Sequence, residues 1–175
     1  MIIAAVVILA QSTTAFALEY TTTLDDGQQM TVLVNLNVPE DITQKSNLVP
    51  DMYEALLPTD LKGLGQAFYD GEQKYNINAL FVLAIVRLES GNGTSSLARN
   101  HNNLGGIKSG EEGYRSFASK EECVDYMFDL LSRKYIGEGR TTISDVGRIY
   151  CATDGWTPQV TSIMNEMIAI CNGTY

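Results

Sequence analysis

The sequence predicts a mostly α-helical domain of the α+β class, in which the β structure is reduced to short hairpins. A length of 175 residues, with 45% hydrophobic and 19% charged side chains, is enough for one domain with a buried core. An almost wholly apolar run, residues 80–88, has the length and composition that are typical of a buried helix. The β-prone runs that follow it are too short for more than a stub hairpin.

The first 17 residues are expected to be a signal peptide. They are apolar and end in Ala15-Phe16-Ala17, a small-x-small pattern that is typical of a signal-peptidase site. The segment holds no Lys or Arg, and after Ala10 it is too polar for a permanent membrane span. We therefore expect export, with Leu18 as the first mature residue and no membrane contact after cleavage. A membrane-tethered leader and a misassigned start codon are the alternatives.

Residues 18–50 are expected to form an N-terminal extension in front of the main domain, residues 51–175. Two β-prone runs flank Asp25-Asp26-Gly27, which predicts a β-hairpin. An isolated hairpin is marginal in water, so we expect it to pack on the domain or on a partner protein. Residues 39–50 begin and end with proline and carry several polar residues, which predicts a linker.

Capping residues and apolar spacing predict the helices of the main domain. Between the second and third of them, residues 108–113 are expected to form a tight turn and residues 114–117 a short strand. In chain order the helices are residues 61–74, capped by Thr59-Asp60; residues 79–89, capped by Asn78; a helix that Ser119 and Glu122 open as a capping box and that ends by Gly137 and Gly139; a short helix from Ser144 to Ile149; and a last helix begun by Thr157-Pro158.

Glu89 is the first candidate for chemistry. It stands at the C-terminal end of the apolar helix, where Gly91 and Gly93 supply the open backbone of a helix cap. Loss of water and the negative end of the helix dipole both favour its protonated form there. A carboxylic acid kept protonated near neutrality is the general acid that glycosidic bond cleavage requires. The alternative is a solvated glutamate, or one paired with Arg87 or Arg99.

Composition argues against several other functions. The net charge of −9 and the pI near 4.5 disfavour nucleic-acid binding. His101 is the only histidine and the cysteines form no CxxC pair, so we expect no metal and no organic cofactor. In an exported chain Cys151 could bridge either Cys171 or Cys123, whereas in a reducing environment all three are small core residues.

Two strings around Glu89, LESGNGTS and LARNHNNLGGIK, resemble the glucosaminidase family of bacterial and phage peptidoglycan hydrolases (a mannosyl-glycoprotein endo-beta-N-acetylglucosaminidase-like domain). The resemblance runs from about Leu61 to Met167 and includes GLGQAFYDGEQKYNINALF and YCATDGW. It implies a lysozyme-like helical domain with a reduced β-hairpin lobe. It also implies a secreted, cell-wall-associated endo-β-N-acetylglucosaminidase, in which Glu89 protonates the leaving oxygen of a β-1,4 bond in the peptidoglycan glycan strand.

The resemblance implies further catalytic residues. Tyr150, in YCATDGW, matches a tyrosine that is important for activity in the family, and it could support the substrate's N-acetyl group or the oxocarbenium charge; a core anchor is the alternative. Glu111 and Glu112 follow the Gly-Ile step, where family members often carry a second carboxylate, and an exposed acidic turn is their alternative. Without a close second carboxylate, two routes are possible. A distant base activates water, which inverts the anomeric carbon, or the substrate's own N-acetyl oxygen attacks the anomeric carbon, which gives retention.

Four residues are candidates for substrate binding. Asn102 and Asn103, with Ile107, resemble the family's step beside the catalytic helix, and their amides could bond an acetamido group or a sugar hydroxyl. The alternative is that one asparagine adopts a left-handed turn and the other caps backbone groups, and for Asn103 we expect both a binding and a structural role. Trp156, the only tryptophan, could stack on a sugar face or pack in the core.

Other activities compatible with this pattern remain open. A muramidase or a lytic transglycosylase would use the same glutamate, and a non-catalytic wall-binding or assembly module would keep the fold. In each case the expected partner is the peptidoglycan glycan strand.

Overall fold

The computed structural model describes residues 5–9, 18–23, 29–33, 36–110, 113–151 and 155–173. The chain divides into two compact units, residues 39–164 and residues 1–38 together with 165–175. None of the described helices is long and apolar enough to cross a membrane.

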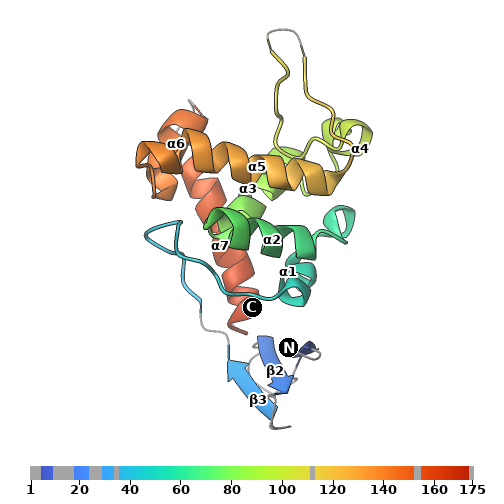
Figure 1. Ribbon diagram of the computed structural model, residues 1–175, viewed down its shortest axis with the longest axis vertical. Coiled ribbons are helices and arrows are strands. Elements are labelled where there is room, and N and C mark those ends of the chain that lie inside the picture. The colour runs from blue at the N-terminus through green and yellow to red at the C-terminus, as the bar shows by residue number, and fades with distance from the viewer. Residues whose placement is uncertain are drawn as a thin grey trace. The chain divides into compact units, whose positions relative to one another are not determined.

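The smaller unit contains a three-stranded antiparallel sheet in the order β1-β2-β3, with β2 and β3 labelled in Figure 1. Strands β2 and β3 occupy the two runs expected to form a hairpin, while the Asp25-Asp26-Gly27 turn lies outside the described residues. Strand β1 lies within the expected signal peptide, so cleavage after Ala17 would leave β2 and β3 as a two-stranded pair. The strands are β1 (Ala5–Leu9), β2 (Leu18–Thr23) and β3 (Gln29–Leu33).

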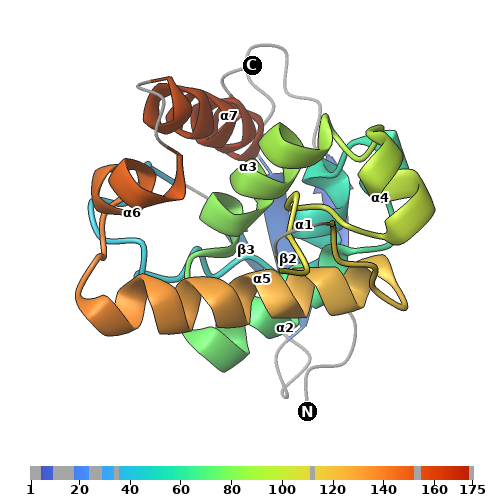
Figure 2. The same cartoon turned by 90° about the horizontal axis from the view of Figure 1, so that it is seen from above.

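The larger unit is helical, which confirms the prediction of a mostly helical domain. Figures 1 and 2 show α5 as a long helix across this unit, and α2 packs against α5, α1 and α3. Helix α7 begins in this unit and continues past its last residue. The elements are α1 (Pro50–Leu56), the 3-10 turn η1 (Thr59–Leu61), α2 (Gly65–Tyr75), α3 (Ala79–Ser90), α4 (Ser96–His101), α5 (Lys120–Lys134), the 3-10 turn η2 (Ile136–Glu138), α6 (Ile143–Tyr150) and α7 (Trp156–Cys171).

Helix α3 forms the centre of this core. Residues 79–86 are all buried, as the apolar run predicted. The side chain of Asn78 accepts the N–H of Phe81 at 3.3 Å and so caps the helix. Gly91, with φ of +57°, ends it in a left-handed cap. Both predicted caps are confirmed, and Glu89 lies in the last turn, one residue before the end.

Residues 39–50, expected to be a linker, instead pack within the larger unit. Ile42 and Leu48 are buried. The N–H of Ile42 donates to Thr141 O at 2.8 Å, and its carbonyl accepts from Asn78 N at 2.7 Å. Proline at each end signals a turn, but local sequence does not show that the apolar side chains between have a core to join. The short helix α1 was missed because seven residues carry too little periodicity.

Two helices begin elsewhere than predicted. Helix α2 begins at Gly65, later than expected, because Gly63 has φ of +91° and separates it from η1. Helix α6 is capped by Thr142 and not by Ser144, since the Thr142 hydroxyl oxygen accepts the N–H of Asp145 at 3.1 Å.

The β element after α4 is smaller than predicted. Residues 114–117 form no strand, and an isolated bridge pairs Lys108 with Tyr114. The N–H of Ser109 donates to Gly113 O at 3.0 Å, which closes the expected tight turn. The strand pairing ends there because the side-chain amide of Asn103, and not a backbone N–H, donates to the carbonyl of Arg115 at 2.8 Å.

Glu72 on α2, which the sequence did not single out, is a buried carboxylate that joins three segments. Its Oε1 accepts the backbone N–H groups of Ser46 at 3.0 Å and Ala79 at 2.9 Å. Its Oε2 accepts the hydroxyls of Tyr53 at 3.0 Å and Ser46 at 3.1 Å. The carboxylate therefore connects residues 39–50 to α1 and to the start of α3.

Glu72→Ala is expected to lower the free energy of unfolding by about 3 kcal/mol or more. The substitution strands several buried donors at once, and each costs roughly 1–3 kcal/mol when left without an acceptor. Urea unfolding of the variant beside Glu40→Ala, at an exposed position, measures the effect. The control should change by less than about 0.5 kcal/mol. Equal stability of the two variants would contradict this role for Glu72.

Candidate active site

Glu89 is half-buried, and a side chain from another helix holds its carboxyl group. The indole Nε1 of Trp156, at the start of α7, donates to Glu89 Oε1 at 3.0 Å. Among the described residues, Oε2 has no hydrogen-bond partner. Arg99, one of the ion-pair partners considered for Glu89, instead pairs with Asp60 at 3.3 Å. One carboxyl oxygen is thus fixed and the other is available.

Three aromatic rings contact one another in sequence, beginning with Trp156, which holds Glu89. Tyr150, the last residue of α6, stacks on Trp156 with ring centroids 4.8 Å apart. The ring of Tyr150 also lies 6.0 Å from the ring of Tyr135, which follows α5. Burial, and then the charge of Glu89, raises the pKa of Tyr150, so its phenol stays protonated at physiological pH. Tyr150 is therefore a neutral hydroxyl within electrostatic reach of Glu89.

Of the two alternatives for Trp156, sugar stacking and packing, the structure shows packing contacts. Trp156 is 3% exposed, and its indole packs edge-on against Phe81 of α3 at 6.5 Å as well as on Tyr150. The packing alternative for Trp156 fits, with the added hydrogen bond to Glu89. Phe81 was missed, although its spacing of eight residues before Glu89 places both on one face of α3.

Asn102 and Asn103 hold the loop after α4. Asn102 is left-handed, with φ of +51°, and its amide donates to the carbonyls of Phe117 and Ala118. Asn103 is 1% exposed, donates to two carbonyls and accepts two backbone N–H groups. Four bonds fill the capacity of an amide side chain, so Asn103 has none left for a sugar. The structural alternative fits both residues.

The other candidates of this loop lie at its far end. Ile107 is half-buried, and Asn103 fixes it through its N–H at 2.9 Å and its carbonyl at 2.8 Å. Glu111 and Glu112 lie outside the described residues. Hydrogen bonds between the backbone and the buried side-chain amide of Asn103 therefore hold the loop around Ile107.

The cysteines and the histidine show packing and surface contacts. All three cysteines are thiols, and the buried Cys123 accepts the N–H of Leu104 at 3.2 Å. His101 is exposed and bonds Ser116 through Nδ1 at 2.8 Å. Within the described ranges, no group of three or more His, Cys, Asp or Glu side chains could hold a metal ion.

Burial raises the pKa of the Cys123 thiol from 9.0 to about 11, which predicts a loss of stability at alkaline pH. The folded protein keeps a proton that the unfolded chain releases, so this contribution is full below pH 9 and is lost as pH rises towards 11. The loss should reach roughly 2 kcal/mol. Urea unfolding at pH 8 and pH 10.5 checks it, and Cys123→Ala should show a smaller decline. A decline of equal size in Cys123→Ala would contradict the assignment.

A half-buried carboxyl at the end of a buried helix, an aromatic wall and a trimmed β element define a helical, lysozyme-like domain with one candidate catalytic acid. The family model for Glucosaminidase, described as mannosyl-glycoprotein endo-beta-N-acetylglucosaminidase, matches residues 65–168. The chain belongs to this glucosaminidase family. The resemblance of the LESGNGTS region is thereby confirmed.

Two curated relatives come from Streptococcus pneumoniae, strains TIGR4 and R6. Each is 29% identical to this chain over 115 residues and carries the provisional name endo-beta-N-acetylglucosaminidase. The match covers 61% of this chain but 18% and 16% of the two relatives. The chain thus spans less than a fifth of their length.

Solved structures share the fold. Autolysin E of S. aureus, in complex with the muropeptide NAM-L-Ala-D-iGlu, is similar with a TM-score of 0.66 and 17% identity, over 84% of this chain and 82% of that one. A catalytic mutant of the same autolysin, in complex with the disaccharide NAG-NAM, has a TM-score of 0.61 and 17% identity, over 82% and 81%. The major bifunctional autolysin has a TM-score of 0.59 and 20% identity, over 73% and 66%. The predicted lysozyme-like fold is confirmed.

Proposed function

We propose that the chain is a secreted peptidoglycan hydrolase, an endo-β-N-acetylglucosaminidase with Glu89 as its general acid. Family membership supports glycoside hydrolysis, and the names of the streptococcal relatives support the type of bond. The ligands of autolysin E support a peptidoglycan substrate. The observation that carries the proposal is the 3.0 Å hydrogen bond from Trp156 to Glu89, which orients one carboxyl group at the end of a buried helix.

The hydrogen bond assigns a task to each carboxyl oxygen. Oε1 accepts from the indole N–H, and for the acid form we assign Oε1 as the carbonyl oxygen. Oε2 then carries the proton and delivers it to the leaving glycosidic oxygen.

Tyr150 is proposed to assist at the anomeric carbon. Its phenol is a hydrogen-bond donor, and its ring contacts the rings of Tyr135 and Trp156. A donor of this kind can hold the substrate's N-acetyl group, or can place its oxygen near the developing oxocarbenium charge.

Glu111 and Glu112 remain proposed candidates for a second carboxylate. If one of them activates water, its change to Gln should lower kcat by about a hundredfold or more, as removal of a general base does. The control is the same change at an exposed site, Glu121→Gln in the first turn of α5. Near-full activity in both Glu111→Gln and Glu112→Gln would rule out these two residues as the second carboxylate.

Product analysis tests the proposed reaction. Purified peptidoglycan is digested with the protein, the fragments are reduced with borohydride, and their ends are identified by mass spectrometry. Reduced N-acetylglucosamine ends are expected. Reduced muramic ends would make the protein a muramidase, and anhydro-muramic ends a lytic transglycosylase. A folded protein that releases no fragments would be a wall-binding module.

Export is part of the proposal. The apolar residues 1–17 and the Ala15-Phe16-Ala17 site support a cleaved signal peptide. N-terminal sequencing of the protein recovered from the medium of its producer should begin at Leu18. Retention of the intact N-terminus in the membrane fraction would contradict export by cleavage.

A further inference from the structure

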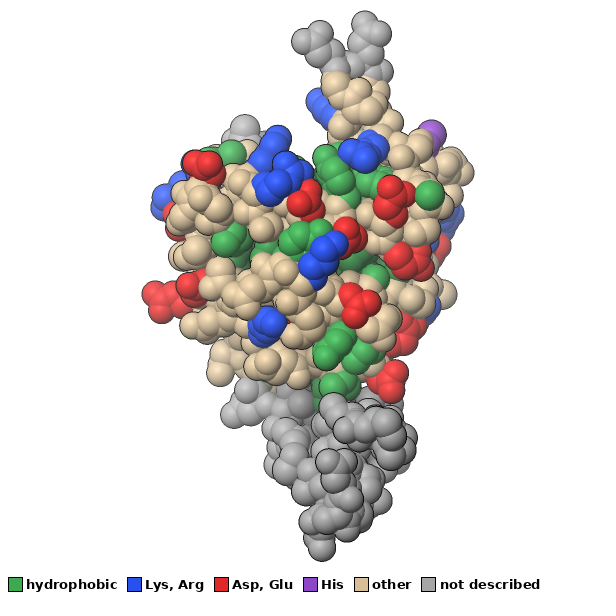
Figure 3. Space-filling model, viewed as in Figure 1, with side chains coloured by type: hydrophobic (Ala, Val, Ile, Leu, Met, Phe, Trp, Pro, Cys, Tyr) green, Lys and Arg blue, Asp and Glu red, His purple; other side chains and the backbone are tan. Residues whose placement is uncertain are grey.

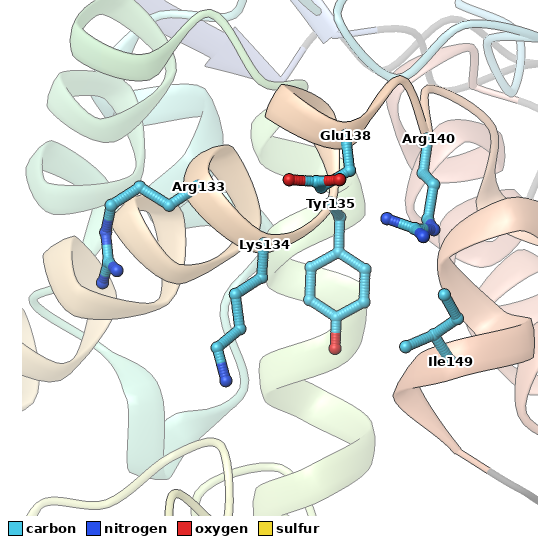
Figure 4. A pocket seen from close by; sticks show the side chains of 6 residues that line it. All are labelled: Arg133, Lys134, Tyr135, Glu138, Arg140 and Ile149. Atoms are coloured by element: carbon cyan, nitrogen blue, oxygen red, sulfur yellow. The ribbon is translucent and has the colours of Figure 1, made fainter.

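A hollow of about 540 Å³ lies at the junction of α5, η2 and α6, apart from Glu89. Figure 4 shows the ring of Tyr135 between Lys134 on one side and Arg140 with Ile149 on the other, while Glu138 lies near the backbone end of Tyr135. The sixth lining residue, Arg133, extends farthest from the others and pairs with Asp129 at 2.6 Å.

Aromatic contacts connect this hollow to the candidate active site. Tyr135, which lines the hollow, lies 6.0 Å from Tyr150, and Tyr150 stacks on Trp156 at 4.8 Å. Trp156 in turn holds Glu89. One ring, that of Tyr150, therefore lies between Tyr135 in the wall of the hollow and Trp156, which holds the candidate acid.

The lining combines three kinds of group. Lys134 and Arg140 are cations that have no carboxylate partner among the described residues, in a chain with a net charge of −9. Ile149 is a large apolar side chain that is 55% exposed, and the buried ring of Tyr135 lies beside it. Glu138 supplies one exposed carboxylate. Such a lining suits a short ligand with carboxylates, methyl groups and an amine.

We infer that this hollow binds the peptide stem of peptidoglycan while the glycan strand lies at Glu89. The inference rests on the proposed function. Stem peptides are attached to alternate sugars of the strand and carry free carboxylates, alanine methyl groups and an amino group. Lys134 and Arg140 bind a stem carboxylate, Ile149 and Tyr135 pack on an alanine methyl, and Glu138 accepts from the amine.

The charge distribution disfavours a long polyanion as the occupant. Glu138 stands within the hollow, and basic and acidic side chains are interspersed over the face drawn in Figure 3. A polyanion would need a continuous basic track, whereas a stem peptide needs only one local pair of cations.

The test compares two substrates that have the same glycan bonds. One is intact peptidoglycan, and the other is the same strand stripped of its stems by an amidase. The double variant Lys134→Gln/Arg140→Gln is expected to lose about tenfold in kcat/KM on intact strands, as the loss of charge-assisted hydrogen bonds implies, and less than about twofold on stripped strands. The control Lys45→Gln/Lys74→Gln removes the same charge at side chains that contact Gln73 and Asp125, and it should change neither rate.

Outcomes separate the hollow from the active site. Equal rates of the double variant and wild type on intact strands would overturn the inference, and so would an equal loss on both substrates. Titration of the free stem peptide into the protein provides a measurement without catalysis, and binding that the double variant loses supports the inference. Wild-type protein that binds this peptide but cleaves neither strand would overturn the proposed function alone.

Discussion

Glu89→Gln is expected to slow the cleavage of purified peptidoglycan by about a hundredfold to ten-thousandfold, the range that general acid catalysis contributes. The amide cannot give a proton to the leaving oxygen, and expulsion of an unprotonated sugar alkoxide is slow. Its carbonyl oxygen can still accept the Trp156 N–H, so the fold around the site should persist. Release of reducing ends, measured with the melting temperature, gives both results.

The matched control is Glu121→Gln, which makes the same chemical change at an exposed position of α5. It should keep full activity. The melting temperature of Glu89→Gln should equal or exceed that of wild type, because an amide avoids the cost of a half-buried carboxyl. Substantial lytic activity in Glu89→Gln would remove this residue as the acid.

Trp156→Phe is expected to lower kcat by about twofold to tenfold, more than it changes KM. The variant removes the indole N–H that orients Glu89, and a hydrogen bond to a neutral carboxyl group contributes roughly 0.5–1.5 kcal/mol. It also removes ring volume beside Phe81 and Tyr150, so a stability loss of about 1–3 kcal/mol accompanies it.

A double-mutant cycle separates positioning from packing. If Trp156 acts through Glu89, Trp156→Phe should lower the residual activity of Glu89→Gln much less than it lowers that of wild type. Its effect on stability should remain similar in both backgrounds. Independent losses of activity, which multiply in the double variant, would make Trp156 a packing residue only.

Local sequence signals were sufficient to predict the core of the fold. The apolar run, Asn78 and Gly91 define α3 because caps and burial act within one helix. Ser119 likewise caps α5 by accepting the N–H of Glu122, while the Glu122 carboxylate accepts the N–H of Ala118 at 2.6 Å and not that of Ser119, as a capping box would require. Glu89 could be located for the same reason, since its position depends only on where α3 ends.

Contacts between distant segments were not predictable from local sequence. The indole of Trp156 meets Glu89 across 67 positions of the chain, and no spacing rule links them. The same holds for Glu72, which gathers Ser46, Tyr53 and Ala79 from three segments. For Asn102 and Asn103 the sequence did single out the residues. Their hydrogen bonds to the loop carbonyls were still not predictable, because those bonds depend on the fold.

Leaving-group dependence tests the general acid role most directly. Wild type and Glu89→Gln are compared on an unmodified glycan strand and on an N-acetylglucosaminyl oligosaccharide with a dinitrophenyl leaving group, which departs without a proton. The role of Glu89 predicts that the variant loses at least about a hundredfold on the strand but regains most of the wild-type rate on the activated substrate. An equal loss on both substrates would contradict proton donation by Glu89.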